Sequence, residues 1–236
     1  GEWDHPGQAV MKTLTNISAY PDYVQKLLDL FAEDTPEEVS EQKEIKYPPY
    51  SKDDFLNEVY MDEDTYNTLT ELLESKYNVI LQGAPGVGKT FAAKRLAYSI
   101  MGQKDTSRVA MVQFHQSYSY EDFIQGYRPS KEGFELENGA FYKFCKEAEE
   151  DNERPYFFII DEINRGNLSK ILGELMMLIE KDKRGEKIKL LYSNEWFTVP
   201  QNVRFIGMMN TADRSLALMD YALIRRFAFF DFAPAF

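Results

Sequence analysis

The sequence predicts an α/β fold, a parallel five-stranded sheet flanked by helices, and three observations support this prediction. Short apolar runs alternate along the chain with helical patterns, which is typical of a parallel sheet. A glycine-rich loop follows the first of these runs and leads directly into a helical pattern. Two consecutive acidic residues end the third run, which is apolar throughout, as expected for a strand covered on both faces.

Residues 1–50 differ in composition from the rest of the 236-residue chain. Apolar residues recur at helical spacing in 20–31, and the acidic stretch 32–41 has little to bury and is typical of a solvated linker. The prolines of 47–50 indicate a stiff, extended end to that linker. We therefore expect residues 1–50 to be a helical segment and acidic linker, the tail of an upstream module, and residues 51–236 to form the α/β domain.

The pattern within the domain predicts its elements in order. Asp64 is expected to cap a helix that runs to about Ser75. The predicted strands and helices are strands 78–82, 109–114, 156–161, 203–209 and 227–232, and helices 90–101, 141–150, 168–180 and 216–223. Short hairpins are expected at 133–140 and at 188–199.

The loop after the first strand is Gly83-Ala84-Pro85-Gly86-Val87-Gly88-Lys89-Thr90, which fits the phosphate-binding pattern G-x-x-x-x-G-K-[ST] without a mismatch. Its glycines let backbone N–H groups turn inward around a phosphate chain, and the following helix points its positive end at it. In this pattern Lys89 reaches the β- and γ-phosphates and Thr90 holds Mg²⁺. The sequence therefore predicts a nucleoside triphosphate site with the contacts Gly83, Pro85, Gly86, Val87, Gly88, Lys89, Thr90 and Phe91.

Polar residues at the ends of two later strands predict the chemistry. Asp161 and Glu162 follow four apolar residues in a Walker B pattern, in which Asp161 holds Mg²⁺ and Glu162 polarises the attacking water. Asn210 ends the strand expected beside the phosphate-loop strand, where an amide can fix a water without adding charge. Asn also favours strand ends as a turn residue, so this second interpretation of Asn210 stays open.

Arg225 and Arg226 follow a predicted helix and precede the last strand. Arginine in this place suits a finger that acts on the nucleotide of a neighbouring subunit. A solvated pair at a helix C-terminus, stabilised by the macrodipole, explains the residues equally well.

Composition limits the partners and the compartment. The net charge of −12, from 39 acidic and 27 basic residues, argues against non-specific binding of polyanions by the chain as a whole. The single cysteine, Cys145, excludes an intrachain disulfide and suits a reducing compartment, so we expect a cytoplasmic protein. No apolar run is long enough to predict a membrane span, and no signal peptide is expected. A chain that begins at Gly1 is expected to be a fragment.

The motifs together resemble those of the McrB-type AAA+ GTPases, the motor subunits of McrBC modification-dependent restriction systems. The similar segments cover about two-thirds of the chain and are GAPGVGKTF at 83–91, VQFHQSYSYEDFIQGYRP at 112–129, FIIDEINRGNLSK at 158–170, DKRGE at 182–186 and MNTADRSLALMDYALIRRFAF at 209–229. The Walker motifs alone are generic, whereas the aromatic segment, DEINR and MNTADRS together are specific.

The resemblance implies a P-loop NTPase of the AAA+ class that assembles into hexameric rings. It also implies an McrC-like nuclease partner that stimulates hydrolysis, and translocation on DNA. Arg165, Arg225 and Arg226 match residues that reach across the subunit boundary, although Ile224 stands where the family often has a third arginine. Asn210 resembles the family's water-positioning asparagine, and Asp213 and Arg214 are expected in the same network. The helical lid subdomain that normally follows is expected to be missing, because the chain stops at Phe236.

A preference for GTP over ATP rests on the resemblance alone. The base is expected near residues 55–61, where Asn57 and Glu58 could contact the guanine edge or be plain surface residues. Two other functions stay open: an AAA+ ATPase of the MoxR or dynein-like branch that remodels protein complexes, and a non-catalytic nucleotide-dependent scaffold.

Three further features favour structural over functional interpretations. The aromatic segment is expected to serve packing or subunit contact rather than to stack single-stranded nucleic acid, because Glu121 and Asp122 would repel phosphate. The basic turn 181–185 could touch DNA backbone, but a solvated turn is the favoured interpretation. Cys145 is expected to be a packed helix residue.

Overall fold

The computed structural model describes residues 47–131, 133–212 and 224–233. These residues belong to a unit that spans Tyr47–Phe236, so residues 47–50 lie in the domain rather than in the expected linker. The backbone explains this boundary, because Tyr50 N donates to Gly102 O (3.0 Å) and Lys104 N donates to Pro48 O (2.8 Å). The helix predicted at 216–223, with Asp213 and Arg214, lies outside the described residues.

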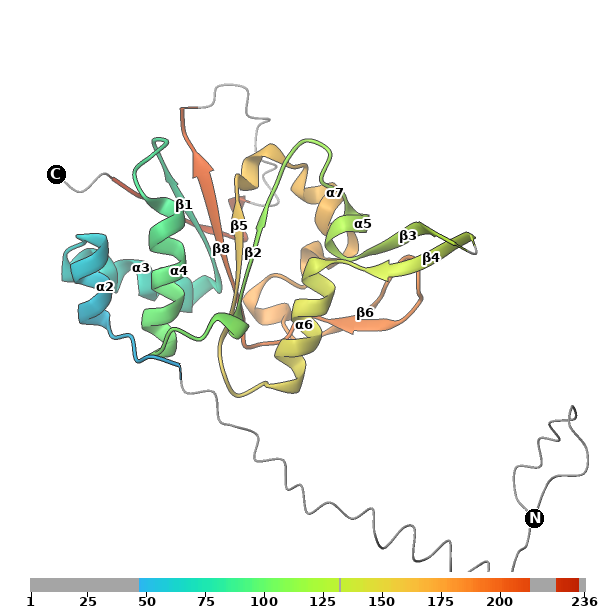
Figure 1. Ribbon diagram of the computed structural model, residues 1–236, viewed down its shortest axis with the longest axis horizontal. Coiled ribbons are helices and arrows are strands. Elements are labelled where there is room, and N and C mark those ends of the chain that lie inside the picture. The colour runs from blue at the N-terminus through green and yellow to red at the C-terminus, as the bar shows by residue number, and fades with distance from the viewer. Residues whose placement is uncertain (1–46, 132, 213–223, 234–236) are drawn as a thin grey trace, which may run out of the picture. The chain divides into compact units, whose positions relative to one another are not determined.

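The central sheet has five parallel strands in the order β2-β5-β8-β1-β9, which confirms the predicted architecture (Figure 1). The strands are β1 (Asn78–Gly83), β2 (Val109–Gln113), β5 (Tyr156–Asp161), β8 (Val203–Asn210) and β9 (Ala228–Asp231). In the register of β1 with β8, Gly83 pairs with Asn210. The carboxyl ends of β1, β8 and β5 therefore lie side by side, and the three predicted site segments follow them.

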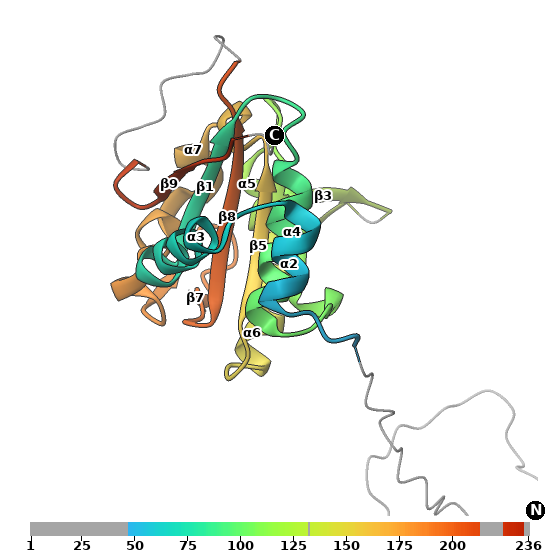
Figure 2. The same ribbon diagram turned by 90° about the vertical axis from the view of Figure 1, so that its left-hand side faces the viewer.

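Helices cover both faces of this sheet (Figure 1). One face packs against α2 (Lys52–Val59), α3 (Glu63–Lys76) and α4 (Lys89–Met101), and the other against α5 (Tyr120–Phe123), α6 (Ala140–Glu150) and α7 (Leu168–Leu172). Figure 2 shows α2 lying beside α4. Within β1, Val79 and Leu81 face the first layer and Ile80 faces the second. Every position of such a strand is buried, which explains the continuous apolar runs.

Polar side chains set the starts of α2 and α3. Ser51 and Asp54 form a capping box at α2. Asp62 caps α3, since its carboxylate accepts from Thr65 N at 2.9 Å. The predicted cap at Asp64 was therefore wrong by two residues, and Asp64 lies in the first turn, where its charge still favours the helix N-terminus.

The helix predicted at 168–180 was also wrong in extent. It ends at Leu172, and a 3₁₀ helix, η3 (Gly173–Met177), follows. Gly173 has φ 50° and ψ −128°, a conformation that favours glycine, and a Cβ there would lie 3.0 Å from the Tyr120 ring. Packing against α5 thus breaks the helix. The other 3₁₀ helices are η1 (Thr106–Arg108), η2 (Ile163–Arg165) and η4 (Lys181–Lys183).

Two antiparallel hairpins stand apart from the sheet. β3 (Gln125–Ser130) pairs with β4 (Gly133–Asn138), so the hairpin predicted at 133–140 contains only its second strand, and the aromatic segment supplies the first. Figure 1 shows this hairpin extending away from the sheet. β6 (Lys187–Lys189) and β7 (Trp196–Thr198) confirm the other predicted hairpin. Its loop packs on α5, where Tyr192 Oη donates to Glu121 Oε1 at 2.7 Å.

Candidate nucleotide site

The phosphate loop lies between β1 and α4, as the sequence predicted. Gly86 and Gly88 have φ of 81° and 90°, in the left-handed region that favours glycine. Gly88 is the N-cap of α4 and makes no side-chain cap, so the N–H groups of the first turn have no side-chain acceptor there. A loop of this form, next to the positive end of a helix, suits a phosphate chain.

Lys89 is the buried cation of the site. Its side chain is nearly inaccessible, and its Nζ donates to Gly83 O (3.0 Å), Ala84 O (2.7 Å) and Asn210 Oδ1 (2.8 Å). Burial lowers the pKa of Lys89, while Glu162 and Asp161 oppose that shift. The ammonium is thus held by neutral oxygens within the loop that it would share with phosphate.

Glu162 stands at the end of β5 in a left-handed conformation, with φ 51°. Its Oε1 accepts from Asn210 Nδ2 at 2.7 Å, and its Oε2 pairs with Arg165 Nε at 3.1 Å. A non-glycine residue with positive φ is uncommon, and such backbone strain gathers at functional sites. Asn210 therefore joins the Walker A lysine to the Walker B glutamate, a contact that a plain turn residue would not make.

The residues predicted to hold Mg²⁺ suit that ion chemically. Thr90 lies in the first turn of α4 with its side chain exposed, and Asp161 ends β5 partly buried. Asp161 Oδ1 accepts from Glu162 N at 2.9 Å, which orients the carboxylate. Mg²⁺ takes oxygen ligands and is bound through few protein groups plus phosphate oxygens, so a hydroxyl and a carboxylate fit it.

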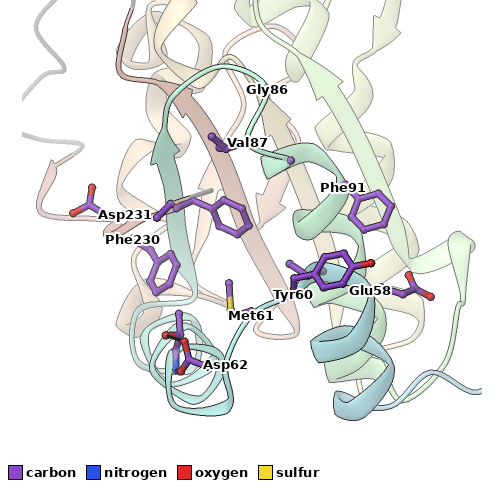
Figure 3. Close-up of a pocket in the computed structure, with 14 residues that line it drawn as sticks. Glu58, Tyr60, Met61, Asp62, Gly86, Val87, Phe91, Phe230 and Asp231 are labelled. Atoms are coloured by element: carbon purple, nitrogen blue, oxygen red, sulfur yellow. Dashed lines mark hydrogen bonds between the residues drawn. The ribbon is translucent and has the colours of Figure 1, made fainter. Parts of the chain in front are cut away.

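A cavity of about 660 Å³ opens beside the phosphate loop (Figure 3). It extends from the loop to the turn between α2 and α3 and to the end of β9. Its lining residues are Glu58, Val59, Tyr60, Met61, Asp62, Thr65, Gly86, Val87, Gly88, Phe91, Phe230, Asp231, Phe232 and Ala233. A cavity next to a phosphate site whose lining combines aromatic and aliphatic side chains with polar groups suits a nucleobase and its sugar.

The expected base segment thus lines the cavity, although its two candidate contacts differ. Asn57 is exposed and is not among the lining residues. Glu58 lines the cavity, yet its carboxylate already pairs with Arg95, with Lys104 at 3.6 Å and with Tyr50 Oη at 3.2 Å. The hydrogen bond from Arg95 is the main cause that lowers the pKa of Glu58. Arg95 also lies 3.2 Å from the centre of the Phe91 ring, so it fixes both cavity residues.

The sequence did not predict the wall that β9 contributes. Phe230, Phe232 and Ala233 reach the cavity because β9 pairs with β1 on the side away from β8, with Asp231 opposite Gln82. The strand order determines this wall, and periodicity does not give it. A residue in the sequence that marks the contact is Gly83, where a Cβ would lie 2.4 Å from Phe232 O, so the two backbone segments approach closely.

The three candidate arginines have different surroundings. The side chain of Arg165 is half exposed and pairs with Glu162 of the same chain. Arg225 is exposed, whereas Arg226 is buried and pairs with Glu180 at 2.7 Å. Arg225 and Arg226 thus differ in solvent exposure, which the sequence alone did not distinguish.

The aromatic segment and Cys145 contribute buried side chains to the core. Phe114, Tyr120 and Phe123 of the aromatic segment are buried, which agrees with the predicted packing role, while His115 is exposed. Cys145 is buried in α6 and is a free thiol, as expected. No helix in the described part of the chain is long and apolar enough to cross a membrane.

Comparison with known proteins identifies the family. Residues 78–227 match the AAA domain of the dynein-related subfamily. Over 200 residues, 80% of the chain, it is 58% identical to the type IV methyl-directed restriction enzyme EcoKMcrB subunit of Escherichia coli (strain K12), of which it covers 44%. Over 193 residues, 64% of the chain, it is 28% identical to the type II restriction enzyme BsuMI component YdiS of Bacillus subtilis (strain 168), of which it covers 56%. The chain thus spans about half the length of these relatives. With its P-loop nucleoside-triphosphatase site, the chain belongs to the dynein-related AAA subfamily and is a McrB-type AAA+ protein.

Proposed function

We propose that this chain is the GTP-hydrolysing core of a ring-forming motor in a McrBC-like restriction complex. The motor would be a homo-oligomer, a hexamer by its family resemblance, that works in the cytoplasm with an McrC-like nuclease subunit and moves DNA. The relatives support this proposal, since both are named as parts of restriction enzymes. One observation carries the hydrolytic part, the continuous path from Lys89 through Asn210 to Glu162.

Each residue has a role in the proposed reaction. Gly86, Gly88 and Lys89 bind the phosphates, and Thr90 and Asp161 hold Mg²⁺, which supplies charge stabilisation when bound. Glu162 orients and deprotonates the attacking water, and Asn210 keeps the Glu162 carboxylate in place. Arg225 of a neighbouring subunit stabilises the charge that develops on the transferred phosphate.

Glu162→Gln tests the hydrolytic assignment in the full-length protein with its partner. The amide keeps the size of the side chain but cannot accept the proton, so turnover should fall by about 10²- to 10⁴-fold while nucleotide affinity stays within about twofold. Glu71→Gln, an exposed change on α3, is the matched control. Unchanged turnover in Glu162→Gln would remove Glu162 from the role of base.

The preference for GTP needs its own measurement. A competition titration between GTP and ATP on the full-length protein should favour GTP. The cavity supports binding of a purine in general, because it offers the aromatic residues Tyr60 and Phe91 beside the phosphate loop. Equal or tighter binding of ATP would contradict the GTP proposal and leave the hydrolytic site intact.

A second function is an ATPase that remodels protein complexes. The match to the dynein-related subfamily is compatible with it, since that description names an AAA domain and no restriction enzyme. Stimulation of hydrolysis by DNA or by the nuclease subunit supports the restriction motor. Stimulation by an unfolded polypeptide, with no response to DNA or to the nuclease, supports remodelling.

A further inference from the structure

A closed polar cluster lies at the amino end of β1, at the edge of the sheet opposite the phosphate loop. Its centre is Asn78, the first residue of β1, whose side chain is fully buried. Asn78 Nδ2 donates to Ile179 O (2.8 Å) and to Arg226 O (3.0 Å), and Asn78 Oδ1 accepts from Arg184 Nη2 (2.8 Å). One side chain thus ties together three segments that are far apart in the sequence.

The Arg226 segment is held twice in this cluster. Its carbonyl accepts from Asn78, and its guanidinium, buried to 7% exposure, pairs with Glu180 Oε1 at 2.7 Å. To reach a second subunit, Arg226 would have to break this pair, and separating a buried charge from its partner is strongly unfavourable. We therefore treat Arg226 as an internal residue of its own subunit.

Arg225, one position earlier, has the opposite surroundings. Its side chain is exposed, and it makes no hydrogen bond or ion pair within the described part of the chain. Its backbone nevertheless adjoins the anchored Arg226 carbonyl. A long cation on a fixed backbone loses less conformational freedom when it binds than one on a mobile backbone.

We propose that Glu180 and Asn78 are positioning residues, which fix Arg226 so that Arg225 reaches the nucleotide of the neighbouring subunit in a productive geometry. This inference rests on the proposed ring motor and its arginine in trans. The inference gives Arg226 the anchoring role and Arg225 the catalytic role. It also predicts that a mutation of the anchor slows hydrolysis in the active site of the neighbouring subunit and not in that of the same subunit.

Glu180→Ala tests the anchor, since the Glu180 side chain is one-third exposed and its loss need not unfold the domain. In the full-length protein with its nuclease partner, kcat should fall by about ten- to a hundredfold, as expected for a misplaced catalytic group, with nucleotide affinity within about twofold. Glu186→Ala is the matched control, because Glu186 is a nearby exposed carboxylate whose one ion pair among the described residues is with Lys183, at 3.1 Å. Turnover of this variant should not change. Glu180→Gln keeps an oxygen acceptor for Arg226 and should restore part of kcat. If Glu180→Ala does not fold, Glu180→Gln provides the test instead, with a smaller expected loss of kcat.

Mixed rings give the decisive readout. Glu180→Ala subunits have an intact hydrolytic site, and Glu162→Gln subunits have an intact arginine, so rings assembled from both should regain turnover. The mixture of Arg225→Ala with Glu162→Gln should regain it in the same way. Recovery only in the Arg225→Ala mixture, or wild-type turnover in Glu180→Ala, would overturn the anchor. Wild-type turnover in Arg225→Ala would instead contradict the arginine in trans, which belongs to the proposed function.

Discussion

Two asparagines at opposite ends of neighbouring strands make similar bonds in different surroundings. Asn210 ends β8 and Asn78 begins β1. The amide oxygen of each accepts from a cation, Lys89 or Arg184, and each amide nitrogen donates to oxygen. Asn210 is partly buried beside the phosphate loop, whereas Asn78 has no exposed surface. The same residue type therefore serves both ends of the sheet. We call the partly exposed end with Asn210 the open end, and the buried end with Asn78 the closed end.

The partners explain the difference in role. Asn210 lies between two charged side chains, Lys89 and Glu162, and the proposed chemistry needs both of these groups. Asn78 Nδ2 instead contacts two backbone carbonyls, which carry no catalytic function. Unpaired polar groups in a closed interior cost free energy, whereas those at an open site can turn to water. Mutations at the open end should therefore lower turnover without a large loss of stability, whereas loss of Asn78 at the closed end should also lower the stability of the domain.

The largest expected effect is on turnover at the open end. Asn210→Ala removes the donor that holds Glu162, so we expect hydrolysis to fall by about 10²- to 10³-fold, the usual loss for one oriented catalytic hydrogen bond. The melting temperature should change little, because Lys89 keeps its bonds to Gly83 O and Ala84 O. Steady-state kinetics and thermal melting of the full-length protein measure both. A large loss of stability with normal turnover would show that Asn210 is a structural turn residue.

The next effect is on stability at the closed end. Asn78→Ala leaves the Arg226 carbonyl and Arg184 Nη2 without this partner, while Ile179 O keeps its bond from Arg184 Nε at 3.1 Å. At about 1–3 kcal/mol for each unsatisfied group, we expect a loss of about 3 kcal/mol in the free energy of unfolding. Urea unfolding measures it. The control is Asn57→Ala, an exposed asparagine on α2 that should cost almost nothing. Equal stability of the two variants would contradict the closed-end interpretation.

The sequence predicted the open end far better than the closed one. The phosphate loop and the Asp161–Glu162 pair are local patterns, because a few consecutive residues determine the backbone that binds phosphate and metal. Asn210 was placed correctly because it ends the strand next to β1. The Arg226–Glu180 pair joins residues that are distant in sequence, and no local pattern reports it.

Tertiary contacts also explain the errors in the elements. The predicted helix at 168–180 stops because Gly173 turns beneath the Tyr120 ring, and that neighbour comes from another part of the chain. The β9 wall of the cavity was missed because periodicity identifies strands but does not give their order. Local chemistry was thus predictable, whereas contacts between distant segments were not.

The smallest expected effect uses Cys145 as a reporter of the closed end. The Cys145 side chain is buried in the core between the sheet and helices α5, α6 and α7, and burial raises the pKa of the thiol. A buried thiol that stays protonated reacts slowly, so modification by a disulfide reagent should follow transient opening of the domain. We expect the labelling rate to rise about tenfold in Asn78→Ala, which loosens the packed end, because the rate tracks the population of open molecules. In Asn210→Ala it should stay within about twofold of the unsubstituted protein. Equal acceleration in both variants would mean that the two ends open together, and the contrast between them would then lie in chemistry alone and not in stability.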